Sequence, residues 1–176
     1  MGITESHLNN SHVDTRLQID GYKLIRNYRR KGKGGGVCVY MRDDMNWQRR
    51  HDLEREDNES IWLELFIKKS KSLLVGFVYR PPDGSKHLGN DFDSTFADVL
   101  LTATAEDKET ILAGDLNCNY MKSSDHEDHK NIIKVNGLKQ LIKQPTRVTK
   151  ETSILIDIIA STHHFNVVKT IVFTND

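Results

Sequence analysis

The chain has 176 residues, of which 37% are hydrophobic and 28% are charged, and its mean hydropathy is −0.56. These values are typical of a globular protein, and the length suits one domain spanning residues 1–176 with one core. Because 25 basic residues balance 25 acidic ones, composition gives no support for nucleic-acid binding, which usually accompanies an excess of positive charge.

Targeting signals are not evident. No stretch approaches the roughly 18 consecutive apolar residues of a membrane-spanning helix. The first ten residues also lack the basic and apolar regions of a signal peptide. We therefore expect an intracellular protein, nuclear or cytoplasmic, that is not secreted and has no membrane partner. The two cysteines, Cys38 and Cys118, favour buried thiols, with a disulfide as the open alternative.

The first half of the chain predicts strands. Gly36–Met41 is apolar, follows a glycine cluster and indicates a buried strand. Ser60–Lys68 alternates apolar and polar residues, which predicts a strand with one solvated face. It should form a hairpin with Leu73–Tyr79, which ends before Pro81 and Pro82 because proline cannot continue a ladder.

The second half mixes helices with strands. Residues 93–105 carry apolar side chains at helical spacing, with Asp93 or Ser94 as the N-cap. A short strand is expected at Ile111–Ala113, and a helix weakened at Gly137 is expected at Asp128–Lys143. Two closing strands are expected at Ile154–Ala160 and Val167–Phe173. This mixture indicates an α/β or α+β domain in which helices cover sheets.

Asp115 and Asn117 follow an apolar strand that ends in Gly114. Side chains at positions i and i+2 project to the same side if strand geometry persists. An acid and an amide so placed can orient a water molecule and hydrogen-bond a phosphate oxygen. The alternative interpretation is structural: Asp115 caps a turn and Asn117 is a loop residue.

Asp157 and Tyr79 each have both a functional and a structural interpretation, whereas Glu5 has no signal of its own. Asp157 lies in an otherwise apolar strand, where a buried charge is costly unless it is paired or performs a task; it could equally face outward at a sheet edge. Tyr79 ends a strand and is either a phosphate contact or an aromatic residue at the edge of the core. Glu5, taken by itself, is only an acid near the N-terminus.

Three local clusters are weaker indications. The basic, glycine-rich run Lys31–Gly36 lacks the ending of a phosphate-binding P-loop, so we expect a hairpin connection. The neighbouring basic run Arg26–Lys33 is either a contact for a nucleic-acid backbone or a solvated loop. Asp125–His129 has zinc-like residue types, but acids at a helix start are expected from the helix dipole.

Several motifs, in this order, resemble the endonuclease domains of LINE-type (non-LTR) retrotransposons, a branch of the endonuclease/exonuclease/phosphatase superfamily. The resemblance covers nearly the whole chain. The matching segments are Ile3–Leu8, Gly34–Tyr40, Glu59–Glu64, Val78–Pro82, Gly114–Asn117, Gln144–Thr149 and Leu155–Asp157. Each motif alone is weak, but their number and order make the resemblance specific.

The resemblance implies a four-layered α/β/β/α sandwich, in which two packed mixed β-sheets are flanked by helices. It also implies a Mg²⁺-dependent hydrolase, with Mn²⁺ as a possible substitute, that nicks DNA and accompanies a reverse transcriptase domain in the full-length protein. Residues rich in oxygen donors, without a convincing cysteine and histidine site, favour magnesium over zinc.

The resemblance also implies individual roles. Glu5 would bind the metal, Tyr79 would contact the scissile phosphate, and Asp115 would activate water with help from Asn117. The remaining implied residues are Asp157, as partner of a catalytic histidine, Asp176, as a catalytic and metal-binding acid, and Arg29, Arg30, Lys31 and Arg147, as contacts to the DNA backbone.

The chain departs from the family at both ends. It starts after the family's first strand, and it stops at Asp176, where the family continues with a histidine that contacts the phosphate. Asn175 replaces the serine of that motif. Two alternatives to a DNA endonuclease therefore stay open: a catalytically dead fragment that retains the fold, and a phosphatase or exonuclease of the same superfamily.

Overall fold

A computed structural model of the chain describes all residues except 31, 57, 123, 165–168 and 174–176. Its six-stranded sheet has the order β4-β5-β6-β7-β11-β8, with bounds Trp47–Arg49, Glu59–Leu65, Leu73–Tyr79, Glu109–Asp115, Asp157–Ser161 and Lys139–Gln140. A three-stranded sheet has the order β1-β3-β2, with bounds Gly2–Thr4, Val37–Arg42 and Tyr22–Asn27. A two-stranded ribbon is formed by β9 (Arg147–Val148) and β10 (Ser153–Ile154). The α-helices are α1 (Phe92–Thr104) and α2 (Glu127–Val135), and the 3-10 turns are η1 (Asp14–Arg16) and η2 (His51–Leu53).

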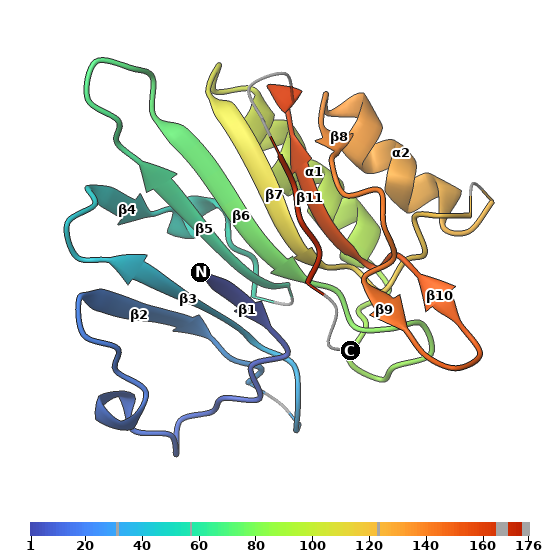
Figure 1. Cartoon of the computed structure of the whole chain (residues 1–176), viewed down its shortest axis with the longest axis horizontal. Helices are drawn as coiled ribbons and strands as arrows, with labels where there is room; N and C mark the ends of the chain where they lie inside the picture. Colours follow the sequence, from blue (N-terminus) through green and yellow to red (C-terminus); the bar gives the residue numbers. More distant parts are fainter. Residues whose placement is uncertain (31, 57, 123, 165–168, 174–176) are drawn as a thin grey trace.

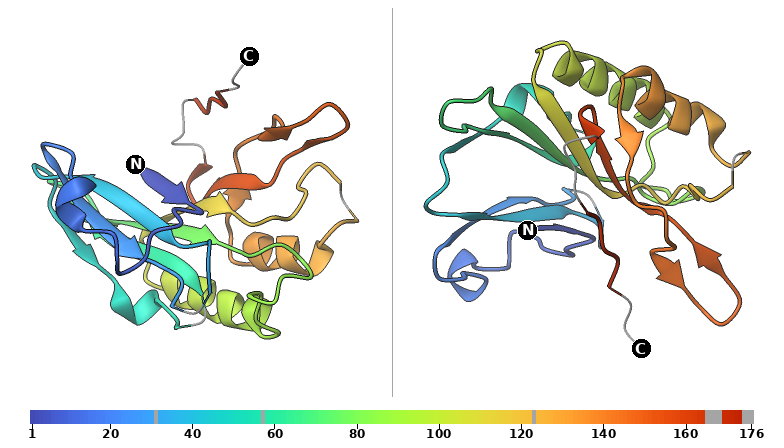
Figure 2. Two further views of the ribbon diagram at one scale, coloured as in Figure 1. Left: turned by 90° about the horizontal axis from the view of Figure 1, so that it is seen from below. Right: turned by 45° about the horizontal axis from the view of Figure 1, so that its top comes forward.

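The large sheet lies between the small sheet and the two α-helices (Figures 1 and 2). Alternation along β5 directs side chains to opposite faces. Ile61 and Leu63 pack with Val39 of the small sheet. Trp62, between them in sequence, packs with Phe96 of α1. Burial on both faces of one sheet therefore creates two cores, one between the sheets and one beneath the helices.

The outer face of the small sheet is covered by the segment that contains η1. The Tyr40 hydroxyl donates to the carbonyl of Leu17 at 2.7 Å. Arg26 donates to the carbonyl of His12 at 2.8 Å and pairs with Asp14 at 3.0 Å. The predicted sandwich of packed sheets flanked by helices is thus confirmed; in the described residues both α-helices lie against the large sheet.

The predicted hairpin is confirmed, because β5 and β6 pair antiparallel from Glu59 opposite Tyr79 to Leu65 opposite Leu73. The expected solvated face of β5 is wrong. Glu64 is only 8% exposed, and it pairs with Arg50 at 3.1 Å and Lys108 at 2.7 Å. Ion pairing lets this acid lie in a buried face where the sequence pattern suggested solvent.

The helix predicted over 128–143 ends early, at Val135. Gly137 has a φ of +75°. The amides of Gly137 and Leu138 donate back to the carbonyls of Lys134 and Ile133, at 3.0 and 3.2 Å. These two bonds form a Schellman motif, in which a left-handed glycine satisfies the last carbonyls of a helix.

The two helices are joined by a partly buried side-chain contact. α1 begins at Phe92 with Asp91 as its N-cap, so Asp93 is free to accept a bond of 2.8 Å from Nδ1 of His129 on α2. The His129 ring also stacks on Phe96, with centroids 5.1 Å apart. The Asp125–His129 cluster therefore supplies a helix start and an interhelical contact.

The last two predicted strands differ from the structure. Ile154–Ala160 is divided, because Ile154 pairs within the β9–β10 ribbon whereas residues 157–161 pair with β7. Asp157 is consequently the first residue of a strand and half-buried. Of the expected strand Val167–Phe173, residues 169–173 belong to no strand, and 167 and 168 lie outside the described residues.

Both cysteines are buried and free, as predicted. Cys38 lies in the small sheet, and Cys118 lies in the core beneath the helices. Within the described part of the chain, no helix is long and apolar enough to cross a membrane.

Candidate active site at one end of the large sheet

Four polar residues lie side by side across neighbouring strands of the large sheet. Glu59 pairs with Tyr79 between β5 and β6, Tyr79 with Asp115 between β6 and β7, and Asp115 with Asp157 between β7 and β11. Partners in register point to the same face. Because Tyr79 belongs to the core between the sheets, this row of Glu59, Tyr79, Asp115 and Asp157 faces the small sheet at the sheet's end.

Glu5 reaches the row from the small sheet. β1 lies over β6 so closely that a side chain at Gly2 would overlap the ring of Phe77. Immediately after β1, Glu5 has a φ of +49° and accepts a hydrogen bond of 2.6 Å from the Tyr79 hydroxyl. Burial first, and then this bond, raises the pKa of Tyr79 far above its usual range, so the hydroxyl remains a donor.

Asp115 is a buried carboxylate of the row whose pKa is raised. It is 9% exposed, and burial raises its pKa to about 6. The charges of Asp157 and Glu5 act in the same direction, whereas a bond from the Asn117 amide and the charge of Arg147 oppose the shift. A carboxyl group with this pKa exchanges a proton near neutral pH, as a general base must.

Asn117 is fixed next to Asp115 by main-chain geometry. Its amide donates to the Asp115 carboxylate at 2.8 Å, and its side-chain Nδ2 donates to the carbonyl of Arg80 at 2.9 Å. It has a φ of +49°, so the chain leaves strand geometry here. The i and i+2 projection expected of an extended strand therefore does not explain how Asn117 lies near Asp115; a tight turn does.

Gly114 allows β7 to approach β6 at this end. Its φ is +148°, and a Cβ atom there would overlap the carbonyl oxygen of Val78. Glycine is required because no side chain fits between the two strands.

Thr146 holds the start of β11. The amides of Ile156 and Asp157 donate to its hydroxyl oxygen at 3.2 and 3.1 Å. Arg147, the next residue, is exposed, and its charge lowers the pKa of Asp115. The segment Gln144–Thr149 thus places one cation beside the acidic row.

The oxygen donors of this site fit a hard divalent cation. Glu5, Asp115 and Asp157 lie close enough for their charges to raise the pKa of Asp115, and a cation among them would offset that repulsion. Among the described residues, no three acidic, histidine or cysteine side chains form a ready-made metal cage. Mg²⁺ typically uses only one or two carboxylates and keeps several waters, so this donor set is compatible with it.

The other predicted site residues lie in different surroundings. Arg29 has an 11% exposed side chain and pairs with Glu59 at 2.6 Å. Arg30 is exposed at 71% and pairs with Glu56 at 2.6 Å. Lys31 and Asp176 lie outside the described residues.

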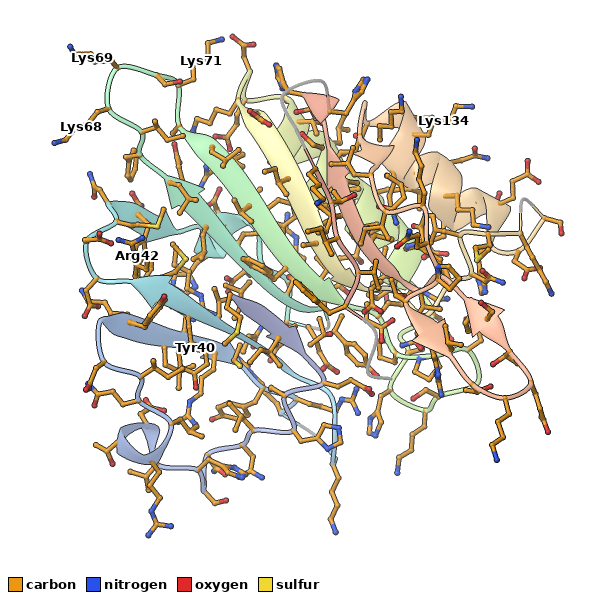
Figure 3. The ribbon with its side chains drawn as sticks, in the orientation of Figure 1. Tyr40, Arg42, Lys68, Lys69, Lys71 and Lys134 are labelled. Carbon is orange, nitrogen blue, oxygen red and sulfur yellow. The ribbon has the colours of Figure 1, made fainter. Side chains whose placement is uncertain are left out.

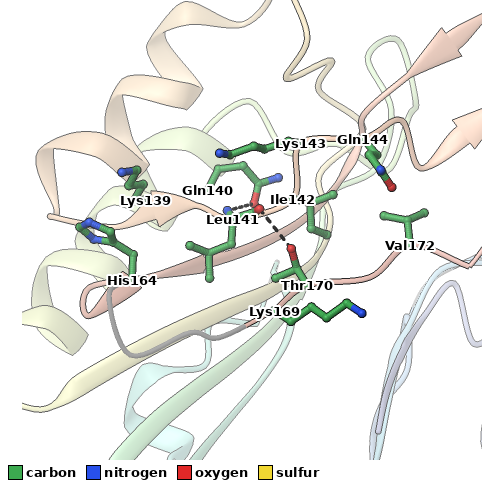
Figure 4. Close-up of a pocket in the computed structure, with 10 residues that line it drawn as sticks. All are labelled: Lys139, Gln140, Leu141, Ile142, Lys143, Gln144, His164, Lys169, Thr170 and Val172. Carbon is green, nitrogen blue, oxygen red and sulfur yellow. Dashed lines mark hydrogen bonds between the residues drawn. The ribbon is translucent and has the colours of Figure 1, made fainter.

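Two hollows flank the sheet. A groove of about 970 Å³ borders Glu59 and Arg29, and four of its arginines are paired with acids: Arg26, Arg29, Arg30 and Arg49. A pocket of about 430 Å³ lies along β8 and is lined by Lys139, Lys143 and Lys169 (Figure 4). This second pocket contains none of the predicted site residues, although Gln144, the first residue of one matching motif, lines it.

Three residues of the site were not assigned a role from the sequence. Glu59 and Thr146 stand inside the matching motifs, and those motifs were the available signal. Arg80 contributes a main-chain carbonyl, for which a sequence carries no signal. Its side chain is buried and pairs with Asp83 at 2.7 Å.

Two packed sheets flanked by helices are the arrangement found in solved structures of the endonuclease/exonuclease/phosphatase fold. No family model and no curated protein matches the chain by sequence. Solved structures of this fold do match.

One similar structure is the endonuclease domain of TRAS1, a telomere-specific non-LTR retrotransposon, with 13% identity, a TM-score of 0.63, and coverage of 82% of this chain and 67% of that one. Another is the 3′ phosphatase NExo from Neisseria bound to a product DNA hairpin, with 11% identity, a TM-score of 0.61, and coverage of 91% and 74%. The human Nocturnin catalytic domain has 15% identity and a TM-score of 0.57, with coverage of 93% and 68%. At these identities the likeness establishes the fold.

Proposed function

We propose that this chain is a divalent-metal-dependent phosphodiesterase that nicks DNA. The observation that carries the proposal is the contact of Glu5 with Tyr79 beside the acidic row, where Asp115 has a pKa raised to about 6. Hydrolysis of a phosphodiester needs a positioned water, a group that accepts its proton, and neutralisation of charge on the phosphate oxygens.

Each residue of the site has a part in this reaction. Mg²⁺, held by Glu5, would supply the charge neutralisation. Asp115 orients the attacking water and accepts its proton. Asn117, fixed by the Arg80 carbonyl, steadies the phosphate and that water. The protonated hydroxyl of Tyr79 donates to a phosphate oxygen once the substrate displaces its bond to Glu5.

DNA as the substrate is supported by the ordered motifs of LINE-type endonucleases and by the fold shared with the TRAS1 endonuclease domain. Under this proposal the full-length protein also carries a reverse transcriptase domain, which would use the 3′ hydroxyl released by the nick.

A second candidate is a phosphatase or exonuclease. NExo, which has this fold, is described as a 3′ phosphatase and as a 3′–5′ exonuclease. An oligonucleotide that carries a 3′ phosphate separates this candidate from the first, because release of phosphate without strand cleavage would indicate a phosphatase.

The decisive experiment compares the parent chain with Asp115→Asn in a nicking assay on supercoiled plasmid with Mg²⁺, and repeats it with a chelator. We expect nicks from the parent alone, and only with metal. Equal products from the two proteins would show that the isolated chain is inactive, as for a fragment that retains the fold without catalysis.

A further inference from the structure

The pair formed by Glu59 and Arg29 has no role in the chemistry described above, although Glu59 lies in the row beside Tyr79. The two side chains are only 13% and 11% exposed, and Nε of Arg29 donates to Oε1 of Glu59 at 2.6 Å. Neither charge is therefore available to a ligand in the way that an exposed cation is. A buried ion pair does not by itself imply stabilisation, so the question is what the pair holds in place.

The second oxygen of Glu59 accepts a hydrogen bond from the amide of Gly36. Arg29 donates its own second bond to the carbonyl of Lys33 at 3.1 Å. A side chain on Gly35, which has a φ of +67°, would overlap both Arg29 and Glu59. The glycine run is thus pressed against the ion pair, and glycine is needed there both for its φ and for the close approach.

Gly35 and Gly36 also hydrogen-bond the turn that carries Glu5. The carbonyls of Gly36 and Gly35 accept the amides of Ser6 and His7 at 3.1 and 2.9 Å. Glu5 and His7 both have positive φ, at 49° and 55°, which is an uncommon conformation for residues other than glycine and must be held by its surroundings. Glu59 is therefore paired with Tyr79 between neighbouring strands. It is also connected to the turn of Glu5 by two hydrogen bonds, one from Gly36 to Glu59 and one from Ser6 to Gly36.

We propose that Glu59, assisted by Arg29, is a positioning residue that fixes the turn bearing Glu5 against the row of Tyr79 and Asp115. The geometric part of this inference stands on the described contacts alone. Its consequence for metal binding rests on the function proposed above. Glu5 is exposed and directly follows a three-residue strand, so without the contacts of Glu59 and Arg29 its carboxylate would sample many positions.

The first test measures amide hydrogen exchange of Ser6 and His7 without metal, in the parent, Glu59→Gln and Glu64→Gln. Glu64 is a matched control because it is also buried and ion-paired on β5, about 16 Å along the strand. We expect exchange at Ser6 and His7 to become roughly tenfold faster in Glu59→Gln only, because a charge-assisted bond is lost. Unchanged protection, or equal acceleration in both variants, overturns the inference.

Should Glu59→Gln fail to fold, Arg29→Lys serves in its place. It retains the positive charge but removes the Nε donor to Glu59, and a smaller acceleration at the same two amides is expected. Protection identical to the parent in this variant counts against the proposal.

The second test titrates the parent and each variant with Mn²⁺ and measures the concentration of free Mn²⁺ by electron paramagnetic resonance. We expect roughly tenfold weaker binding by Glu59→Gln, loss of binding by Glu5→Gln, and parental affinity in Glu64→Gln. Excess Mg²⁺ should restore nicking by Glu59→Gln but not by Glu5→Gln. If the parent binds no Mn²⁺, the proposed function fails, and the exchange result still decides whether Glu59 positions the turn.

Discussion

Burial and like charge act together on Asp115. Asp115 lies near Asp157 and Glu5 at one end of the large sheet. Burial, with the charges of these two acids, raises the pKa of Asp115 to about 6. A folded-state pKa above the unfolded value means that the native state binds more protons in the interval between the two. Ionisation of Asp115 therefore costs stability, and under the proposed function the same raised pKa would let Asp115 act as a base near neutral pH.

The free energy of unfolding in metal-free buffer should reveal this cost. Without a cation, the stability of the parent relative to Asp115→Asn should fall as pH rises from about 4 to about 6, by roughly 1–3 kcal/mol. Urea denaturation at several pH values measures it. A constant difference between the two proteins would contradict the raised pKa of Asp115.

The nicking rate should rise with pH through the same pKa. The ionised form of Asp115 is the one that accepts a proton, so we expect the rate at low pH to increase about tenfold per pH unit and to level off above about 6. Bound cation would move this midpoint downward. A rate that falls as pH rises from about 4 to about 7 would contradict Asp115 as the base.

Removal of the Tyr79 hydroxyl distinguishes the role of this residue in the site from its packing in the core. In Tyr79→Phe the ring still packs between the sheets, so the loss of stability should be about 1 kcal/mol, whereas the bond to Glu5 disappears. We expect nicking to fall roughly 10- to 100-fold. Thermal denaturation with the plasmid assay measures both effects. Unaltered activity would exclude a contact between this hydroxyl and the phosphate.

At the scale of secondary-structure elements, the junction of β6 and β7 depends on Gly114. In Gly114→Ala the new methyl group would overlap the carbonyl oxygen of Val78, so we expect a loss of more than about 3 kcal/mol in the free energy of unfolding. Gly137→Ala is the control: it also has a positive φ, but nothing lies within 4 Å of its Cβ, so about 1 kcal/mol is expected. Equal losses, measured by urea denaturation, would mean that φ alone matters.

Local patterns identified the strands that carry the site but not how they align. Tyr79 ends an apolar run two residues before Pro81, and Asp115 follows Gly114 at the end of another apolar run. These patterns left a structural interpretation of both residues open, and the resemblance to LINE-type endonucleases selected them as site residues. Tyr79 and Asp115 lie side by side because β6 and β7 pair in parallel with these two residues in register. Register between strands that are separated by a helix depends on packing, and no local pattern encodes it.

The errors at element boundaries have physical causes. Leu138 and Ile142 stay buried in the core beneath the helices although the helix has already ended, so apolar spacing continued past Gly137. Glu64 pointed to solvent in the sequence pattern, but Arg50 and Lys108 neutralise it inside the sandwich. Tertiary contacts decided both cases, and they join residues far apart in the chain.

At the scale of the whole molecule, positive charge is distributed at both ends of the large sheet. Arg30 and Arg147 are exposed at the end that carries the row. Lys68 and Lys69 are exposed on the loop between β5 and β6, at the opposite end (Figure 3). If DNA lies across the row, only the first pair can contact its backbone.

The salt dependence of DNA binding tests this arrangement. Arg30→Ala with Arg147→Ala should weaken binding and reduce the slope of log affinity against log salt by up to about 2, because each lost phosphate contact changes the slope by roughly 0.9. Lys68→Ala with Lys69→Ala, which removes the same charge, should change it little. Fluorescence anisotropy with labelled DNA measures both. Equal effects would indicate binding through net charge without a preferred face.

The alignment of Glu59, Tyr79, Asp115 and Asp157 also limits which insertions and deletions the chain tolerates. Successive residues of a strand face opposite sides, so deletion of a single residue inside β6 would turn Tyr79 toward the helices and move Phe77 away from Gly2. Length changes in the loop that carries Lys68 and Lys69 would leave the alignment unchanged. Natural variation in length should therefore concentrate at that end of the molecule and avoid the interiors of β5, β6, β7 and β11.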